Sequence, residues 1–364
     1  MRALVVNAGS SSLKLRLLDE HDELLQRHDV EDWDGGSSAL VAVARAWRFD
    51  AVGHRVVHGG AELTRPVVVD DEVARRIEGL TSLAPLHQPR ALAGIAATRE
   101  AFVDQPSVAC FDTAFHAAMP QGASTYAVPQ AWRDRWPIRR FGFHGLSHAY
   151  AAHRTAALLD EPAEQLRLLT CHLGAGSSLC AIRGGTSVDT TMGFTPLEGL
   201  VMATRSGTVD PGLVLWLILV GGLAPDEVND GLEHDSGLTA LAGTGKLEEV
   251  IAQAAEARQV ASAAIDVYVH RLVREMGAMV ASMGGVDAIA FTGGVGENAA
   301  IIRSRAVDGM AHLGARIDED LNRSVRPDAR LHADGSAVAV FVIEAREDVE
   351  IAKQVRDVCG RSAE

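Results

Sequence analysis

The hydrophobic and polar positions form the same short pattern near the start of the chain and again about one domain later. Mostly apolar runs at 3–7 and 13–18 flank one Gly/Ser turn, and mostly apolar runs at 166–172 and 178–182 flank another. Each turn contains the string Ala-Gly-Ser-Ser, at 8–11 and at 175–178. Short apolar runs bounded by Gly and Ser are typical of β-strands, so the pattern predicts two strand–turn–strand units. Such turns offer backbone N–H groups and hydroxyls to phosphate oxygens, which indicates two similar domains closing on one phosphorylated ligand.

Other apolar runs and stretches of helical periodicity predict an α/β protein. The further predicted strands are 23–30, 51–57, 107–112, 187–191, 287–292 and 338–343, and the predicted helices are 37–47, 70–80, 89–102, 248–283 and 348–359. The helix at 248–283 is expected to bury one face, made of Val260, Ala264, Val267, Leu272, Met276 and Val280. The apolar stretch 212–224 is too short to span a bilayer and predicts a buried helix.

Composition narrows the class of protein. The 364 residues are enough for two domains, and the net charge of −14 argues against binding to nucleic acid or to an anionic membrane. It leaves anionic small substrates open, because local basic residues set the field in a cleft. The four cysteines lack zinc-site spacing, and strand-like sequence begins by Ala3 with no visible signal peptide. We therefore expect a reduced, cytoplasmic protein, with Cys171 and Cys180 as core residues.

Seven motifs occur in a fixed order along nearly the whole chain. They are Asn-Ala-Gly-Ser-Ser-Ser-Leu-Lys (7–14), Gly-His-Arg-Val-Val-His-Gly-Gly (53–60), Phe-Asp-Thr-Ala-Phe-His (111–116), Phe-Gly-Phe-His-Gly-Leu-Ser-His (141–148), His-Leu-Gly-Ala-Gly-Ser (172–177), Arg-Ser-Gly-Thr-Val-Asp-Pro-Gly (205–212) and Gly-Gly-Val-Gly-Glu-Asn (293–298). Each is weak alone, but together they are specific. By these motifs the chain resembles the acetokinase family, within the superfamily of sugar kinases and actin-like ATPases.

The resemblance implies two ribonuclease-H-like α/β domains of the actin and sugar-kinase type, with an active-site cleft between them. One domain would comprise residues 1–118 with 348–364, and the other residues 119–347. The implied reaction is reversible, in-line transfer of the γ-phosphoryl group of ATP to acetate, which gives acetyl phosphate and ADP. The implied metal is Mg²⁺, with Mn²⁺ as an alternative. A homodimer is implied by the family alone.

The resemblance also implies four catalytic residues, and the chemistry explains their types. Both reactants are anionic, so the site needs fixed positive charge, a metal and in-line positioning. Arg55 would grip the acetate carboxylate, and Arg205 would offset charge on the transferring phosphoryl group. His144 would donate to that group's equatorial oxygens. Asp112 would organise the metal water and the arginines, since acetate is already deprotonated and needs no general base.

The remaining implied site residues bind substrate, nucleotide or metal. The acyl group would contact Val57, Leu86, His87, Phe143 and Pro196, besides Arg55. The phosphates and nucleoside would contact Ser10, Ser12, Lys14, His172, Leu173, Gly174, Ala175, Gly176, Gly294, Val295, Gly296, Glu297 and Asn298. Asn7 and Glu347 would be the metal positions, which suits Mg²⁺ because it keeps most of its waters.

The sequence departs from the family pattern at four places. The stretch between Lys14 and Arg55 is shorter than usual, and Ala175 replaces an Asn. The usual Asp-x-Arg of the nucleoside site is replaced by Lys246-Leu247-Glu248. Near Glu347 the usual Asn-Glu-Glu run is Ala-Arg-Glu-Asp. A propionate or short-chain acid kinase, a pyrophosphate donor, and an actin-like ATPase or inactive regulator therefore remain as alternatives.

Overall fold

The computed structural model describes residues 1–9, 12–85, 87–324 and 326–361, and it contains two compact units. The first unit comprises Met1–Ala117, Phe143–Tyr150 and Arg346–Glu364. The second comprises Ala118–Gly142 and Ala151–Ala345. The division expected from the sequence, at 118 and 348, did not assign 143–150 to the first unit. That short segment carries Phe143 and His144, two of the residues expected to bind substrate or act in catalysis.

The first unit is built on a mixed sheet of six strands in the order β3-β2-β1-β4-β6-β5. β1 pairs antiparallel with β2 and parallel with β4, and β4 pairs parallel with β6. The strands are β1 (Ala3–Ala8), β2 (Ser12–Leu18), β3 (Leu24–Glu31), β4 (Ala51–Val56), β5 (Val67–Val68) and β6 (Ser107–Phe111). All of the strands expected here form, and the two-residue β5 is an addition.

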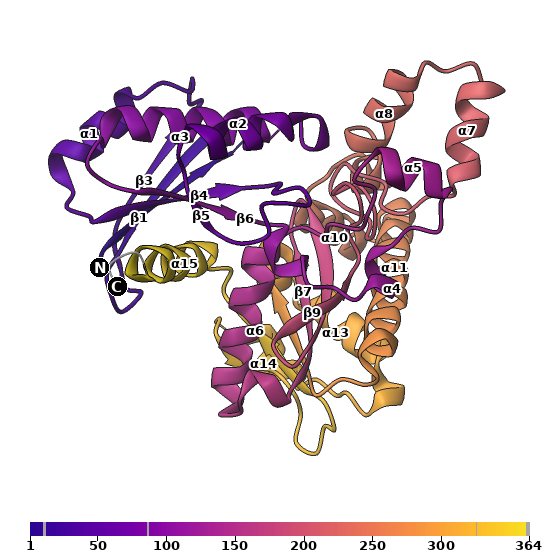
Figure 1. The fold of residues 1–364 in the computed structure, drawn as a ribbon. Helices are drawn as coiled ribbons and strands as arrows, with labels where there is room; N and C mark the ends of the chain where they lie inside the picture. Colours follow the sequence, from indigo (N-terminus) through magenta and orange to yellow (C-terminus); the bar gives the residue numbers. More distant parts are fainter. Residues whose placement is uncertain (10–11, 86, 325, 362–364) are drawn as a thin grey trace. The chain divides into compact units, whose positions relative to one another are not determined.

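Alternate residues along β1 enter two different cores, as the period of a strand requires. Leu4 and Val6 pack with helices α1 (Ser38–Ala46) and α3 (Gln88–Ala101) on one face of the sheet. α2 (Asp71–Gly79) packs beside α3 on the same face. Val5 packs on the opposite face with α15 (Glu347–Arg361). Figure 1 shows α1, α2 and α3 over one face of this sheet and α15, in yellow, over the other. α15 therefore carries Glu347 at its first position, against β1 and β4.

The second unit repeats this architecture. Its sheet has the order β11-β12-β10-β7-β8-β9, with strands β7 (Arg167–Leu173), β8 (Ser177–Arg183), β9 (Thr186–Thr190), β10 (Ala288–Thr292), β11 (Ala329–Arg330) and β12 (Ala339–Val342). Read from the hairpin side, β9-β8-β7-β10-β12-β11 corresponds strand for strand to β3-β2-β1-β4-β6-β5. The repeated Gly/Ser turn therefore marks a repeated fold unit, and the expected α/β class with two similar domains is confirmed.

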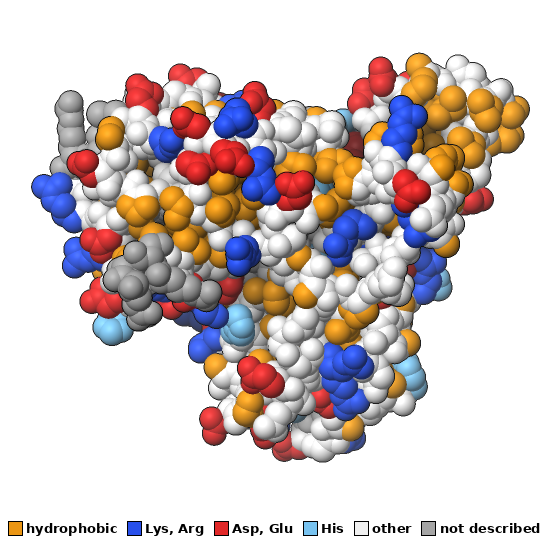
Figure 2. Space-filling view, viewed as in Figure 1, with side chains coloured by type: hydrophobic (Ala, Val, Ile, Leu, Met, Phe, Trp, Pro, Cys, Tyr) orange, Lys and Arg blue, Asp and Glu red, His pale blue; other side chains and the backbone are white. Residues whose placement is uncertain are grey.

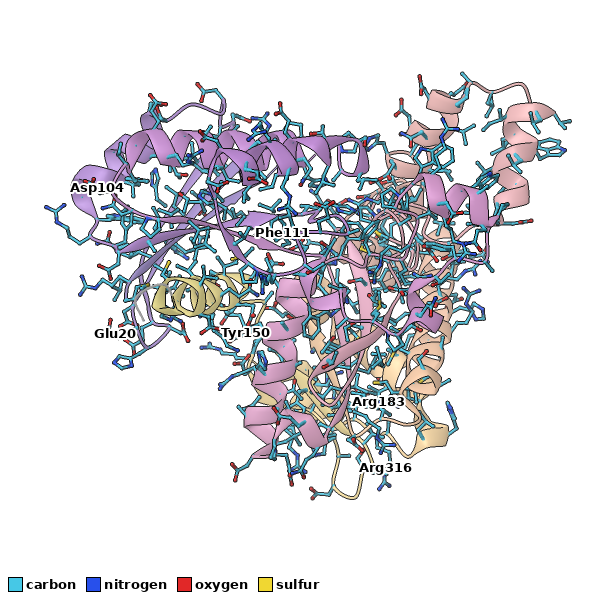
Figure 3. All side chains as sticks on the ribbon, in the orientation of Figure 1. Glu20, Asp104, Phe111, Tyr150, Arg183 and Arg316 are labelled. Carbon is cyan, nitrogen blue, oxygen red and sulfur yellow. The ribbon has the colours of Figure 1, made fainter. Side chains whose placement is uncertain are left out.

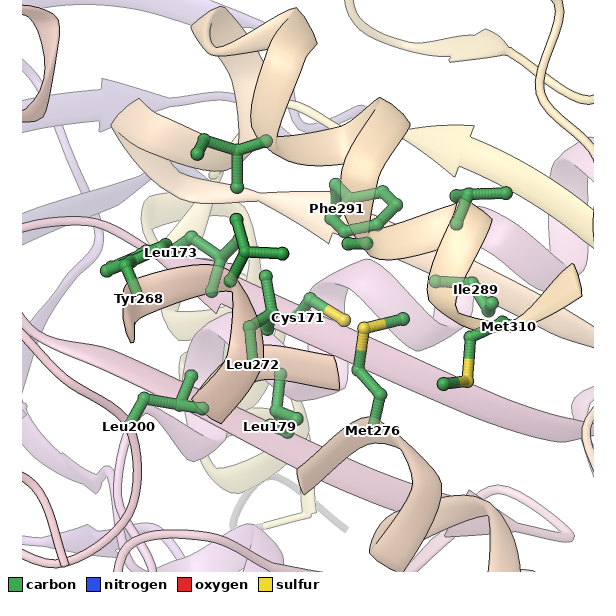
Figure 4. Packing of buried hydrophobic residues seen from close by; sticks show 14 of the residues in the cluster. Cys171, Leu173, Leu179, Leu200, Tyr268, Leu272, Met276, Ile289, Phe291 and Met310 are labelled. Carbon is green, nitrogen blue, oxygen red and sulfur yellow. The ribbon is translucent and has the colours of Figure 1, made fainter. Parts of the chain in front are cut away.

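The core of the second unit forms between this sheet and α11 (Gln259–Met283). Tyr268, Leu272 and Met276 of α11 point toward Cys171 and Leu179 of the sheet (Figure 4). Ala264, Leu272, Met276 and Val280 are buried as expected, but Val260 and Val267 are 66% and 40% exposed. The buried row runs through Ala261, Ile265, Tyr268 and Leu272, so Val260 and Val267 lie about one residue off its centre.

Two helical predictions are wrong. The stretch 248–283 forms two helices, α10 (Leu247–Ala255) and α11, because Ala257 between them has a φ of +60°. The stretch 212–224 forms α7 (Pro211–Leu219), but no residue of α7 is buried. α7 is followed by Gly221 and Gly222, which end the helix, and the described residues of the second unit do not cover it.

The other helices are α4 (Gln121–Ser124), α5 (Gln130–Arg135), α6 (Gly145–Leu159), α8 (Pro225–Glu233), α9 (Gly237–Ala242), α12 (Gly293–Asn298), α13 (Ala300–Gly309) and α14 (Glu319–Ser324). Among the described residues, no helix is both long and apolar enough to cross a bilayer.

The thiols of Cys110, Cys171 and Cys180 are free and buried, which confirms that Cys171 and Cys180 are core residues.

Candidate active site

In the first unit, Arg55 contacts two carboxylates, that of Asp112 directly after β6 and that of Glu347 at the start of α15. β4 and β6 are parallel, and Arg55 pairs in register with Cys110, two residues before Asp112 (Phe111 is labelled in Figure 3). Arg55 Nη2 lies 2.7 Å from Asp112 Oδ2, and Arg55 Nε lies 3.1 Å from Oδ1. Arg55 Nη1 lies 3.0 Å from Oε2 of Glu347. The guanidinium is therefore held by a two-point contact on one side and a single contact on the other.

The burial of these three side chains differs. The Asp112 side chain is 2% exposed, whereas those of Arg55 and Glu347 are 20% and 17% exposed. Burial lowers the pKa of Arg55, but the charges of Asp112 and Glu347 and the hydrogen bond to Asp112 raise it more, so its pKa lies above the usual value. Arg55 is thus a permanent cation in a fixed orientation, with part of its surface open to a ligand.

The Asp112 backbone also positions His144. The N–H of Gly145 donates to the carbonyl oxygen of Asp112 at 2.9 Å, and His144 immediately precedes Gly145. His144 has a φ of +57°, in the left-handed region that non-glycine residues adopt rarely. Its carbonyl accepts the N–H of His148 at 2.9 Å and so begins α6. The structure thereby brings His144 into the same unit as Arg55 and Asp112.

Phe143 lies among buried histidines. Its ring makes an edge contact with His58 at 5.5 Å between centroids, and its carbonyl oxygen lies 3.0 Å from Nε2 of His116. Burial lowers the pKa of His116 to about 4, so at neutral pH the ring is uncharged and its protonated Nε2 donates to Phe143. Of the other expected acyl-site residues, Val57 is half-buried directly after β4 and His87 precedes α3, while Leu86 lies outside the described residues.

The expected metal and phosphate positions also lie in the first unit. Asn7, half-buried near the end of β1, pairs in register with Lys14 of β2, whose side chain is exposed while Leu13 and Leu15 are buried. Ser12 begins β2, whereas Ser10 lies outside the described residues.

No group of three His, Cys, Asp or Glu side chains among the described residues could hold a metal ion. The oxygen donors of Asn7 and Glu347 fit Mg²⁺, which binds few protein ligands and retains waters.

In the second unit, Arg205 has its own set of partners. Arg205 Nε lies 3.2 Å from Oε2 of Glu233, and Nη1 donates to the carbonyl oxygen of Pro196 at 3.2 Å. The side chain is 23% exposed. Pro196 and Arg205 are therefore in contact through this hydrogen bond.

The second unit also contains a pocket of about 580 Å³ at the carboxyl ends of β7 and β10. These two strands are parallel, and His172 pairs in register with Thr292, so the turn at 174–176 and helix α12 start at the same sheet edge. Of the expected nucleotide residues, the pocket is lined by Gly174, Ala175, Gly294, Val295 and Asn298. His172, Leu173, Gly176, Gly296 and Glu297 lie in the same two segments without lining it.

The first two glycines of α12 differ in the space around them. Gly293 has a φ of +79°, and a Cβ there would lie 2.7 Å from the carbonyl oxygen of Leu173. A Cβ at Gly294 would meet nothing within 4 Å, so this position opens onto the pocket. Lys246, Leu247 and Glu248 line the pocket too, so the altered sequence element belongs to it.

Leu238, Ile251, Tyr268 and Ala299 also belong to the apolar lining, and sequence reasoning missed them. Their signal was only that of core residues on amphipathic helices. Burial raises the pKa of Tyr268 to about 12, despite the nearby Ser177 hydroxyl. The lining is more apolar than polar, so it suits an apolar portion of a ligand.

Known proteins resemble this chain over almost its full length. The sequence profile described as the Acetokinase family matches residues 38–353. Acetate kinases of Streptomyces avermitilis and Streptomyces coelicolor are 42% and 43% identical to it, over 99% of this chain and 98% of theirs. Among solved structures, a Porphyromonas gingivalis acetate kinase has a TM-score of 0.92 at 32% identity, covering 98% of this chain and 99% of its own. A propionate kinase from Francisella tularensis has a TM-score of 0.90 at 32% identity with the same coverage.

Proposed function

Because this chain belongs to the Acetokinase family, we propose that it catalyses reversible, in-line transfer of the ATP γ-phosphoryl group to acetate, with acetyl phosphate and ADP as products. The observation that carries the proposal is the Arg55 guanidinium, held by Asp112 and Glu347 at the carboxyl ends of β4 and β6. A fixed, partly open guanidinium suits a carboxylate substrate, because its planar fork can hold both oxygens.

The roles of the site residues follow from charge and donor type. Arg55 binds the acetate carboxylate and aims one oxygen at the γ-phosphorus. Arg205 stabilises negative charge on the transferring group, and His144 donates a hydrogen bond to its oxygens. Asp112 fixes the orientation of Arg55 through the two-point contact. No general base is required, because acetate is ionised at neutral pH.

The metal would be held by Asn7 and Glu347 with help from the phosphates, and Ser12 and Lys14 would contact phosphate oxygens. Mg²⁺ supplies charge neutralisation on the phosphates when bound, and Mn²⁺ has the same preference for oxygen ligands. Glu347 is already engaged by Arg55, so metal affinity and the orientation of Arg55 depend on the same carboxylate.

The nucleoside of ATP would occupy the pocket of the second unit, against Gly174, Gly294 and the apolar wall formed with Tyr268. We expect acetate to be favoured over propionate, because the resemblance assigns Val57 and Phe143 to the acyl site and a bulky Val57 would leave little room for a longer acid. One additional methylene changes selectivity by only about 1–3 kcal/mol, and the structural likeness to a propionate kinase keeps that acid as the competing substrate.

A second copy of the chain is proposed to cover α7. Leu215, Trp216 and Leu219 are 57%, 55% and 77% exposed, and the helix carries no charged residue. Figure 2 shows apolar surface gathered over this part of the chain. Contiguous exposed apolar surface of this kind marks an interaction site, and a homodimer buries it on both partners. The free thiols and the net charge of −14 accord with a cytoplasmic location and with no nucleic-acid partner.

The proposal is tested by trapping acyl phosphate as the hydroxamate. Purified protein with Mg²⁺ is given acetate or propionate as acceptor, and ATP or pyrophosphate as donor. Product with ATP and acetate, at a higher kcat/KM than with propionate, is expected. Product only with propionate, or only with pyrophosphate, would change the assigned substrate. No product from any pair would refute the kinase assignment and favour an ATPase or an inactive relative.

A further inference from the structure

Arg303 is a charged side chain in the interior of the second unit. The residue is 2% exposed and is the largest fully buried side chain among the described residues. Burial lowers its pKa to about 10, so it is still a cation at neutral pH. A buried cation is costly to the fold unless it is well hydrogen-bonded. Its four hydrogen bonds all go to neutral oxygen atoms and none to a carboxylate. The role of this buried charge therefore needs an explanation other than an ion pair.

Two of those bonds end on α12. Nη1 of Arg303 donates to the carbonyl oxygen of Gly296 at 2.8 Å and to that of Glu297 at 2.7 Å. These carbonyls lie in the last turn of α12, where they have no partner within the helix. The other two bonds anchor the guanidinium, because Nε donates to Oδ1 and Nη2 to the backbone oxygen of Asn322, at 2.8 and 2.7 Å. Nδ2 of Asn322 donates to Ala300 at 2.9 Å and closes the network.

α12 needs this support more than most helices. It has six residues, of which three are glycine. Short helices are marginal by themselves, and each glycine costs about 1 kcal/mol relative to alanine. At the other end of α12, Oε1 of Glu297 accepts the N–H groups of Gly293 and Ala345 at 3.1 and 3.0 Å. The helix is thus held from both ends by side chains rather than by its own propensity.

We propose that Arg303 is a positioning residue for the nucleotide: by holding the Gly296 and Glu297 carbonyls, it keeps α12 in the conformation that lines the pocket. Gly294, Val295 and Asn298 of the same helix form part of the pocket wall. Arg303 does not line the pocket and acts only through α12. This inference rests on the proposed function, since it assumes that the pocket receives the nucleoside of ATP.

The test replaces Arg303 by methionine, which has similar length but no donor, and measures the dissociation constant of ATP by calorimetry. We expect the constant to rise at least about tenfold, as the loss of charged hydrogen bonds predicts. The KM for acetate at saturating ATP should stay within about twofold of the original, because Arg303 bonds to residues of the second unit, whereas Arg55, the proposed acetate ligand, belongs to the first. Arg305→Met is the matched control, since Arg305 lies on the same helix but pairs with exposed Asp266.

Unchanged ATP affinity in folded Arg303→Met would overturn the inference, as would an equal loss in ATP affinity and acetate KM. If that variant does not fold, Asn322→Ala keeps the charge but removes one acceptor and the link to Ala300; unchanged ATP affinity there would also overturn it. Arg303→Lys should restore part of the affinity. A wild-type protein that binds ATP without making acyl phosphate would refute the proposed function but not this inference. A wild-type protein that binds no ATP would refute both.

Discussion

The backbone N–H of Gly145 donates to the carbonyl oxygen of Asp112 at 2.9 Å, and a Cβ at 145 would lie 2.1 Å from that oxygen. Only glycine permits this approach, and the contact sets where α6 begins and where His144 stands. Gly145→Ala should therefore displace His144 relative to Asp112, at a cost of roughly 1–3 kcal/mol. We expect kcat to fall by at least about tenfold, measured together with the melting temperature.

The matched control is Gly277→Ala in the middle of α11, where a Cβ would meet nothing within 4 Å. This change should leave kcat unaltered and stabilise the helix by up to about 1 kcal/mol. Equal kcat for the Gly145 variant and the wild type would show that the close approach is not needed for catalysis.

Arg55→Lys tests the two-point contact with Asp112. An ammonium group cannot reproduce the bonds at 2.7 and 3.1 Å and leaves a nearly buried carboxylate poorly paired. We expect kcat/KM for acetate to decrease by an amount equivalent to a loss of roughly 3 kcal/mol of transition-state stabilisation. The KM for ATP should change little. Steady-state kinetics with each substrate varied gives both values. Arg76→Lys, at an exposed pair with Glu62, is the control and should leave the kinetic constants for both substrates unchanged. A similar loss of kcat/KM in this control would argue against a specific role for Arg55.

Three buried histidines predict acid sensitivity. Burial lowers the pKa of His54 to about 3 and those of His58 and His116 to about 4. In the unfolded chain the usual value is about 6.5, so between these values the unfolded state binds more protons. Their contribution to stability is thus fully present above about pH 6.5 and is lost as the pH falls toward the folded values.

Urea unfolding at about pH 7.5 and about pH 5.5 measures this effect, and we expect a lower free energy of unfolding and proton uptake at the acid value. His116→Asn should reduce that pH dependence. A free energy of unfolding that does not change between the two pH values would contradict the burial of uncharged rings.

The α7 surface predicts the oligomeric state. Leu215→Glu with Trp216→Glu places two charges on the exposed apolar helix and should convert a dimer into monomers, as measured by light scattering after gel filtration. Val103→Glu, at an apolar residue that is 83% exposed in the first unit, should leave the mass unchanged. A wild-type protein that is already monomeric at micromolar concentration would contradict the proposed interface.

Features encoded by local sequence could be predicted from the chain alone. The strand–turn–strand units, the strand that carries Arg55, the strand that precedes Asp112 and the Gly-rich segment after β10 all form where apolar periodicity and glycine indicate them. Lys14 is exposed between buried Leu13 and Leu15, as strand alternation requires. The order of motifs was likewise enough to identify the family.

Tertiary structure decided what depends on long-range contacts. The left-handed His144 follows from the approach of Gly145 to Asp112, and the burial of Arg303 follows from carbonyls that two other helices supply. α7 is as apolar as a core helix, yet the described residues of its unit do not cover it. Hydropathy records only a residue's preference for burial, whereas burial itself depends on which distant segments pack against it.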